Sequence, residues 1–257
     1  MTRLFSRSNR DLLVELVRAT FVATDHNSAF GVVWSLVGPL AMLLVLYLVF
    51  SARFGSEVGA YPLYLLVGIA LASFFVTGTR YMITVFAVNA PLVQNSAVPR
   101  ETLVASRLSV HLFNLLAQLL LCGCLSVYYG LLPWHAIPLA IPLLIAYVAL
   151  VAGIGLGLAL IHAFARDVEH IWNLFAPLVF FATPIFYQLD SLSPVARAVV
   201  YWLNPLTPFV LAFRDQLMAD GVGGWGAFWH SLVLGSVAFA IGYAAFLTLE
   251  HAVVERA

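Results

Sequence analysis

The chain contains no lysine, and all 12 of its basic residues are arginines. A phosphate-binding loop of the Walker A type needs a lysine to reach the phosphates of ATP. Enzymes that form a Schiff base with their substrate also depend on a lysine amine. Both classes are therefore excluded. No cofactor is expected on this chain, and any ATP that it depends on, with its Mg²⁺, must be bound by another subunit.

Charge of either sign is scarce. Charged residues make up 9% of the sequence and hydrophobic residues 63%, with a mean hydropathy of +0.98. A soluble domain carries about 25% charged residues, so the composition indicates a membrane protein. The formal net charge is zero, and no nucleic-acid partner is expected because nucleic-acid binding depends on a basic surface.

Cysteine is nearly absent as well. Cys122 and Cys124 lie two residues apart in an apolar run, a spacing that places them on roughly opposite faces of a helix. They are therefore expected to form neither a mutual disulfide nor a shared metal site. The charged turn at residues 162–170 contains histidines and carboxylates, but its spacing fits no standard zinc site. No metal site is predicted.

Catalytic patterns are missing too. The sequence has no GxSxG or HExxH motif and no pair of acids within an apolar run. Carriers driven by protons or sodium usually need buried ionisable groups near the middle of the membrane. The acids here lie in tails, loops or the edges of apolar runs. The chain is therefore predicted to be neither an enzyme nor a secondary transporter.

Long apolar runs are what the chain does have. A membrane-spanning helix needs about 20 apolar residues. Six runs qualify and predict an all-α, polytopic membrane protein with spans at residues 32–50, 63–88, 103–129, 136–161, 171–187 and 228–249. This divides the chain into an N-terminal part (1–31), a six-span domain (32–249) and a C-terminal tail (250–257). Gly153 and Gly157 form a GxxxG pair in the fourth run, which predicts close helix packing.

The distribution of arginine predicts the orientation. If the N-terminus is cytoplasmic, the inner segments hold eight arginines (3, 7, 10, 18, 100, 107, 166 and 256) and the outer segments three (53, 197 and 214). This bias agrees with the positive-inside rule and predicts that both termini are cytoplasmic. The arginine-rich start is not followed by a short apolar region with a cleavage site, so no cleavable signal peptide is expected.

Two segments outside the spans have helical character. Residues 9–25 carry apolar side chains at helical spacing with charged ones opposite, which predicts an amphipathic helix lying in the membrane interface. Between the fifth and sixth spans, residues 193–203 and 208–218 are apolar but too short to cross. They are separated by Asn204-Pro205 and Thr207-Pro208, and short re-entrant helices on the outer face are predicted.

The third span carries a polar stripe. Arg107, His111, Asn114 and Gln118 follow one another at spacings of four, three and four, so they share one helix face. Exposure of these groups to lipid is costly, and the stripe is expected to face protein or a hydrated cavity. Two interpretations remain open: hydrogen-bonded contact between helices, and a polar path for a hydrophilic or phosphate-bearing substrate from the cytoplasmic side.

Other side chains are candidates for a substrate path. Arg80, within the second span, either extends its head group to the interface or meets a phosphate, for which the guanidinium is well suited. Aromatic residues make up 14% of the chain, and some of them could line a path and stack on sugar rings instead of only anchoring span ends. The candidates chosen for this role are Phe74, Phe181 and Tyr187.

Several motifs, taken in order along the chain, resemble those of one family. They are Arg10-Asp11-Leu12-Leu13, Ser28-Ala29-Phe30-Gly31 through Trp34 to Pro39-Leu40, Asn89-Ala90-Pro91-Leu92-Val93 leading to Pro99-Arg100-Glu101, Ala165-Arg166-Asp167-Val168, Thr183-Pro184-Ile185-Phe186-Tyr187 and Asn204-Pro205-Leu206-Thr207-Pro208. In this order the set resembles the permease subunits of type-2 ABC exporters, and within them the exporters of O-antigen, capsular polysaccharide or teichoic acid. The resemblance covers nearly the whole chain.

The resemblance implies a homodimer of six-span permeases in the bacterial inner membrane, in contact with membrane lipid. Two separate ATPase subunits would hydrolyse ATP, and the substrate would be a glycan carried on a polyprenyl diphosphate. It also implies that residues 89–102 form a coupling helix that docks in the ATPase, with a second contact at the turn between spans four and five. The residues that would carry this coupling are Asn89, Pro91, Gln94, Pro99, Arg100, Glu101, Arg166 and Asp167.

Two alternatives stay open from the sequence. The first is a type-2 ABC permease for a lipid or a small drug, which a narrow, dry cleft would favour over the wide, hydrated and aromatic-lined channel expected for a polymer. The second is an integral membrane enzyme that modifies a glycolipid. Such an enzyme would need acidic or histidine side chains converging at the membrane face, a cluster that the sequence does not indicate.

Overall fold

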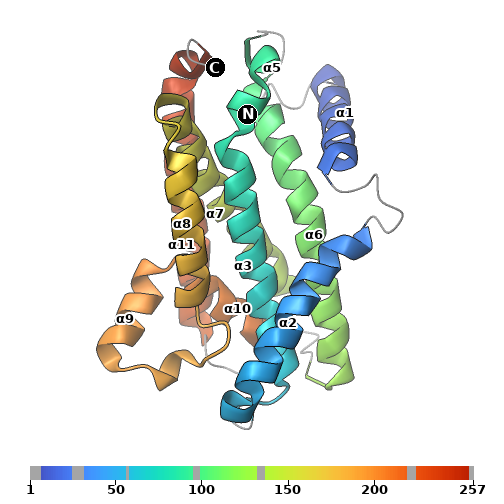
Figure 1. Ribbon diagram of the computed structural model, residues 1–257, viewed down its shortest axis with the longest axis vertical. Helices are drawn as coiled ribbons and strands as arrows, with labels where there is room; N and C mark the ends of the chain where they lie inside the picture. The colour runs from blue at the N-terminus through green and yellow to red at the C-terminus, as the bar shows by residue number, and fades with distance from the viewer. Residues whose placement is uncertain are drawn as a thin grey trace.

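The computed structural model describes residues 7–24, 32–55, 58–94, 99–131, 137–218 and 224–254, and within these ranges every regular element is a helix (Figure 1). Residues 25–31, which include part of the second resembling motif, and residues 95–98 of the coupling segment lie outside them. The helices are α1 (Arg7–Thr24), α2 (Val32–Phe54), α3 (Tyr61–Ile83), α4 (Val85–Val88), α5 (Ala90–Gln94), α6 (Arg100–Tyr128), α7 (Ile137–Phe164), α8 (Val168–Ala182), η3 (Leu189–Ser191), α9 (Pro194–Leu203), α10 (Thr207–Met218) and α11 (Gly224–Val254).

Five helices are long and apolar enough to cross a membrane: α2, α3, α6, α7 and α11. They correspond to five of the six predicted spans, which confirms an all-helical, multi-pass architecture. α8 is an apolar helix of 15 residues, about 22 Å long, and it ends before the predicted limit at residue 187. It stops because Thr183 precedes a proline, which disfavours the helical conformation, and has the extended angles φ −75° and ψ 138°.

α9 and α10 form the pair of short helices expected between the last two spans. They meet at an angle of 92° across a break of a few residues. The chain breaks where Asn204 takes an extended conformation before Pro205. In Figure 1 both helices lie at one end of the bundle, here called the α10 end. α5 and the last turns of α11 lie at the opposite end, here called the α5 end.

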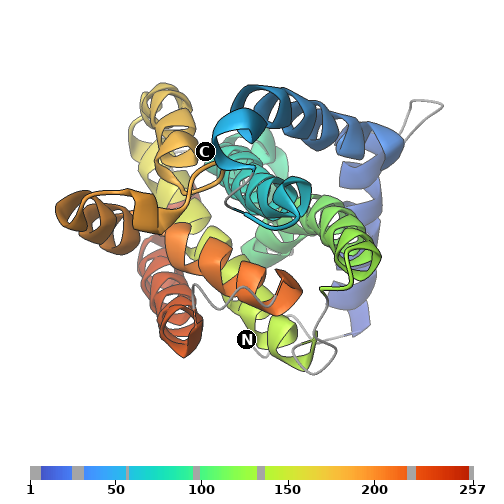
Figure 2. The ribbon, with the colours of Figure 1, turned by 90° about the horizontal axis from the view of Figure 1, so that it is seen from below.

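α3 is the central helix. It packs against α2, α6, α7, α8 and α10, and Figure 2 shows it surrounded by neighbours in the view along the bundle. Between Tyr61 and Phe75 all its residues are buried except the half-buried Pro62 and Ser73, and this part is apolar on nearly all sides, as is typical of a central helix. Hydrogen bonds join it to α7 and α8, among other neighbours. Tyr147 of α7 donates to the carbonyl of Leu71, and Trp172 of α8 donates to Oγ1 of Thr79 at 3.0 Å.

The closest helix pair is α7 and α11, where backbone meets backbone. A Cβ atom at Gly235 would lie 2.1 Å from the carbonyl oxygen of Ala146, and one at Gly242 would lie 2.2 Å from that of Gly153. Gly153 is thus at the predicted close contact. Gly157 is not, because a Cβ atom there would meet nothing within 4 Å. The GxxxG prediction is therefore wrong for Gly157, and the second half of the contact comes from the glycines of α11.

α1 packs along α6 near the α5 end (Figure 1). Leu13, Leu16 and Val17 are half-buried, whereas Asp11 and Glu15 are exposed. Leu16 contacts a group of buried apolar side chains, here called the end cluster, contributed by α3, α4, α5, α6, α7 and α11. Its buried members are Met82, Val85, Phe86, Val93, Leu103, Val104, Leu156, Ala159, Leu160 and Phe246.

Candidate functional site

Three of the four members of the polar stripe come together at one cavity. His111 and Gln118 are buried, with exposed fractions of 8% and 5%, and Asn114 is half-buried. They line a cavity of about 310 Å³ between α2, α3 and α6, here called the polar cavity. The remaining lining residues are Gly38, Pro39, Met42, Ser73, Phe74, Thr77, Tyr81 and Leu115. The stripe therefore faces both protein and a cavity.

The polar cavity holds unsatisfied acceptors. The side-chain oxygens Oδ1 of Asn114 and Oε1 of Gln118 are buried, and neither has a hydrogen-bond partner among the described protein groups. The rings of Tyr81 and His111 lie beside each other, with centroids 4.4 Å apart. Phe74 adds an aromatic surface that also packs on Tyr147 at a centroid distance of 5.7 Å.

The other predicted path residues lie elsewhere. Arg107 is half-buried one turn before His111, and Arg80 is exposed on α3; neither lines the polar cavity. Phe181 is 55% exposed on α8. Tyr187 is half-buried and donates to the carbonyl of Ala182 at 2.9 Å. The predicted path residues thus fall into two regions, the polar cavity and a second one formed by α8 with the segment that follows it, and the two arginines lie apart from both.

The coupling segment is anchored in the end cluster. Asn89 donates from Nδ2 to the carbonyl of Val85 at 2.7 Å and so holds the corner between α4 and α5. Val93 of α5 is buried, whereas Pro91 is exposed, so one side of α5 is fixed and the other is free to contact a partner. Gln94 is the last residue of α5, and the half-buried Pro99 and Glu101 flank the start of α6.

An ion pair joins the coupling segment to the last helix. Arg100, the first residue of α6, lies 3.5 Å from the carboxylate of Glu250 in α11. Arg166 and Asp167 are exposed in the turn between α7 and α8, which lies at the same end of the bundle as α5 (Figure 1). The histidine His162 faces Glu169 across this turn at 3.8 Å. The residues predicted for coupling therefore share the α5 end.

A third group, at the α10 end, was not predicted from sequence. The chain after α8 bends repeatedly between residues 183 and 187, and four consecutive carbonyls in it accept hydrogen bonds from side chains of α3 and α10. Arg214 donates to the carbonyls of Pro184 and Ile185 at 2.7 and 2.9 Å. The hydroxyls of Tyr61 and Tyr64 donate to the carbonyls of Phe186 and Tyr187, both at 2.8 Å. Tyr61, Tyr64, Arg214 and residues 184–187 are here called the outer clasp.

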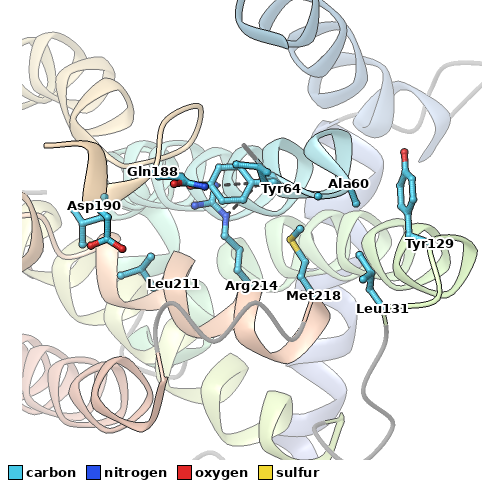
Figure 3. A pocket seen from close by; sticks show the side chains of 12 residues that line it. Ala60, Tyr64, Tyr129, Leu131, Gln188, Asp190, Leu211, Arg214 and Met218 are labelled. Carbon is cyan, nitrogen blue, oxygen red and sulfur yellow. Dashed lines mark hydrogen bonds between the residues drawn. The ribbon is translucent and has the colours of Figure 1, made fainter. Parts of the chain in front are cut away.

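Arg214 is the centre of the outer clasp (Figure 3). It is 1% exposed, and its Nε and Nη2 donate to the carbonyl of Tyr64 at 3.3 and 3.0 Å. It borders a cavity of about 390 Å³ that also involves Gln188 and Asp190. The sequence count placed Arg214 among the arginines of the outer segments. The structure adds that its guanidinium is buried and bound to carbonyls, so it also holds the packing of this region.

A second polar link fixes the turn between α9 and α10. Asn204 donates from Nδ2 to Oγ1 of Thr183 at 2.9 Å and accepts from the backbone of Leu206 at 3.0 Å. Two motifs that the sequence analysis treated separately, at 183–187 and 204–208, are therefore in contact. The signal that could have found the outer clasp is Arg214 itself, since an arginine inside an apolar helix must find polar partners.

Comparison with known proteins agrees with this architecture. Residues 12–218 match the ABC-2 type transporter family. The chain is 25% identical to an O-antigen export system permease protein RfbA of Klebsiella pneumoniae over 95% of its own length and 94% of that protein. It is 27% identical to the protein of the same name in Myxococcus xanthus over 80% of its length and 79% of that protein. The resemblance seen in the sequence is thereby confirmed, and the chain belongs to the ABC-2 type transporter family.

Proposed function

We propose that the chain forms the transmembrane path of an ATP-driven exporter that moves a lipid-linked, O-antigen-like polysaccharide out of the cytoplasm. The observation that carries this proposal is the similarity to O-antigen export permeases along 95% of the chain. Membership of the ABC-2 family makes the chain a membrane permease and not a catalytic subunit. The expected substrate is a glycan attached to a polyprenyl diphosphate.

The working assembly in this proposal has two copies of the chain and two ATPase subunits, which bind ATP and Mg²⁺. The absence of lysine in the sequence supports a separate ATPase. Two helices present apolar faces that the described part of the protomer leaves exposed: Leu44 and Leu48 of α2 are 61% and 69% exposed, and Leu174 and Leu178 of α8 are 73% and 60% exposed. A second copy and membrane lipid are the expected neighbours of these faces.

In the proposed topology the α5 end is cytoplasmic and the α10 end faces outward across the bacterial inner membrane. Both termini are then cytoplasmic, with the domain division at residues 31 and 249. α1 would lie at the inner interface, for which its half-buried Leu16 and exposed Glu15 are suited. The 92° bend between α9 and α10 supports a re-entrant pair at the outer face.

The proposed mechanism runs from one end of the bundle to the other. Closure of the ATPase dimer pushes α5 and the turn that holds Arg166 and Asp167. Because Val93 belongs to the end cluster, the push reaches α6, α7 and α11 as a displacement of packed helices. α9 and α10, held by the outer clasp, then act as an outer gate. The substrate path would involve Arg80, Arg107, His111, Asn114, Gln118, Phe74, Phe181 and Tyr187.

The test is reconstitution of the chain with its ATPase in proteoliposomes that contain a fluorescent polyprenyl-diphosphate glycan. The expected result is movement of the glycan across the bilayer that depends on ATP and stops when the ATPase carries a substituted Walker A lysine. Movement of phospholipid or a hydrophobic dye, with the glycan left in place, would overturn the proposal in favour of a lipid or drug permease. Chemical change of the glycolipid by the chain alone would overturn it in favour of an enzyme.

A further inference from the structure

The polar cavity between α2, α3 and α6 has chemistry that helix packing does not explain. Gln118 is 5% exposed, yet its Oε1 has no hydrogen-bond partner among the described protein groups, and neither has Oδ1 of Asn114. A buried acceptor without a donor bears the full penalty of desolvation. Asn114 and Gln118 lie one helical turn apart and both border the cavity, so their amides indicate a site that expects hydrogen-bonding groups from outside the protein.

The lining residues indicate a neutral ligand. Among the described residues that border the polar cavity, none is an Asp, Glu, Lys or Arg. Arg107 lies one turn away on α6 and does not border it. A diphosphate or an anionic lipid head group would need cationic or multiple backbone donors, and of the residues that border the polar cavity only His111 has a side chain that can carry a positive charge. Hydroxyl groups supply the donors that amide oxygens lack.

Size and shape restrict the ligand further. The cavity volume of about 310 Å³ is many times the volume of one water molecule and lies at the lower limit for small-molecule sites, about 300 Å³. Phe74 and Tyr81 border it with aromatic surface, which favours the apolar face of a sugar ring. Gly38 of α2 also borders the cavity and leaves space beside it, because a Cβ atom there would meet none of the described residues within 4 Å.

We infer that the polar cavity is a subsite for one neutral, hydroxyl-rich sugar residue, bound through the amides of Asn114 and Gln118 and stacked against Phe74 or Tyr81. The inference rests on the proposed export function and adds to it the substrate unit that the permease recognises. It also favours the substrate path over the contact between helices as the interpretation of the stripe, because a packed polar contact would leave no buried amide oxygen without a donor.

Direct binding tests the subsite. The probe is methyl β-D-glucopyranoside, compared with its glucuronate analogue and with glycerol phosphate. Binding is followed by saturation-transfer NMR on the permease with its ATPase in lipid nanodiscs. The neutral glycoside is expected to bind and the two anions to give no signal. In Gln118→Leu, which keeps the volume but removes the acceptor, affinity for the glycoside is expected to fall about tenfold. Gly38→Leu is expected to abolish binding by filling the cavity.

Matched controls lie in a second cavity that is bordered by α6, α7 and α10. Gln216 there also has a buried, unpartnered Oε1, and a Cβ atom at Gly123 also meets nothing within 4 Å. Gln216→Leu and Gly123→Leu are therefore expected to bind the glycoside as the wild type does. Melting curves and gel filtration verify that each variant is folded.

The inference is overturned if Gln118→Leu binds the glycoside as well as the wild type does, or if an anion binds better than the glycoside. A higher melting temperature of Gln118→Leu with glycoside binding unchanged would identify the stripe as a packing feature and would also overturn it. If instead the proposed export function is wrong, the two experiments would disagree. Glycoside binding would still depend on Gln118, but the reconstituted complex would move no glycan.

Discussion

Arg214 binds Tyr64 in two ways at once. Its guanidinium carbon lies 3.3 Å from the centroid of the Tyr64 ring, and its Nη2 donates at 3.0 Å to the carbonyl of the same residue. Desolvated cation–π contacts contribute about 2 kcal/mol, and hydrogen bonds from a charged donor about 1.5–3 kcal/mol each. The pair therefore fixes α10 against α3 at the point where both helices hold the segment after α8.

Replacing Arg214 is expected to release this segment. Arg214→Met retains the aliphatic stem but leaves the carbonyls of Tyr64, Pro184 and Ile185 without their donor. The free energy of unfolding is expected to fall by about 3–5 kcal/mol, as when one partner of a buried charged network is removed. Thermal unfolding of purified protein, followed by tryptophan fluorescence, measures the change.

Arg197→Met is the matched control for Arg214→Met. Arg197 forms an ion pair with Asp190 at 3.0 Å, but its side chain is 44% exposed. Surface ion pairs contribute about 0–1 kcal/mol, so this variant should unfold almost as the wild type does. Equal destabilisation by the two substitutions would contradict the central role given to Arg214.

The α7–α11 contact makes a second prediction. Gly242→Ala would place a methyl group 2.2 Å from the carbonyl oxygen of Gly153, so the two backbones must separate. Overpacking of this kind typically costs about 1–3 kcal/mol, and a contact against rigid backbone is expected to reach the upper part of that range. The yield of folded protein in membranes and its melting temperature in detergent should both fall.

Gly157→Ala provides the control on the same helix pair. A Cβ atom there would meet nothing within 4 Å, and alanine favours a helix over glycine by about 0.5–1 kcal/mol. The variant is expected to be as stable as the wild type or slightly more stable. A severe loss of stability at Gly157 would instead support the GxxxG pair that the sequence suggested.

Local features were the ones that the sequence could predict. α9 and α10 begin and end close to the predicted limits, because Pro205 disfavours continuation of α9 through Asn204 and Pro208 is tolerated in the first turn of α10. The polar stripe was assigned to one face of α6 because helical periodicity places residues three and four apart together. Both inferences need only the spacing of residues along a single helix.

Long-range contacts were not accessible in this way. The outer clasp joins Arg214 to Tyr64, 150 residues earlier in the chain, and Tyr61 to Phe186, 125 residues later. The glycines of α11 become recognisable as contact residues only when Ala146 and Gly153 of α7 are placed against them. In each case the partner depends on how helices pack, and one sequence without an alignment carries no signal for that pairing.

A third prediction concerns the link between α8 and the α9–α10 turn. Asn204→Ala removes the 2.9 Å bond to Thr183 and the acceptor for the backbone of Leu206. Loss of two buried hydrogen bonds, with one N–H left unsatisfied, is expected to lower the free energy of unfolding by about 2–3 kcal/mol. If α9 and α10 act as an outer gate, ion leakage through reconstituted vesicles should rise as well.

Thr183→Val and the double variant test whether the two residues act as a unit. Each single substitution breaks the one hydrogen bond that the two residues share. The sum of the two single losses in the free energy of unfolding should therefore exceed the loss in the double variant by about 0.5–3 kcal/mol. Ser193→Ala, at the exposed start of α9, removes only a cap interaction of 3.4 Å and should leave the leak unchanged. Strict additivity of Asn204→Ala and Thr183→Val would contradict a direct coupling.

The ion pair between Arg100 and Glu250 makes the last prediction. Their atoms lie 3.5 Å apart, with side-chain exposed fractions of 17% and 26%, so the pair is partly shielded and joins the start of α6 to the end of α11. Arg100→Glu and Glu250→Arg each place like charges in contact. Each variant is expected to weaken the link between ATP hydrolysis and transport, measured as glycan moved per ATP in proteoliposomes.

The charge-swapped double variant separates a direct pair from two independent effects. Arg100→Glu combined with Glu250→Arg restores opposite charges, and transport per ATP should return to near the wild-type value. Arg53→Glu reverses an exposed arginine in the last turn of α2, at the opposite end of the bundle from the pair, and should change nothing. If the double variant moves no more glycan per ATP than the less active of the two single variants, Arg100 acts on the ATPase directly and not through α11.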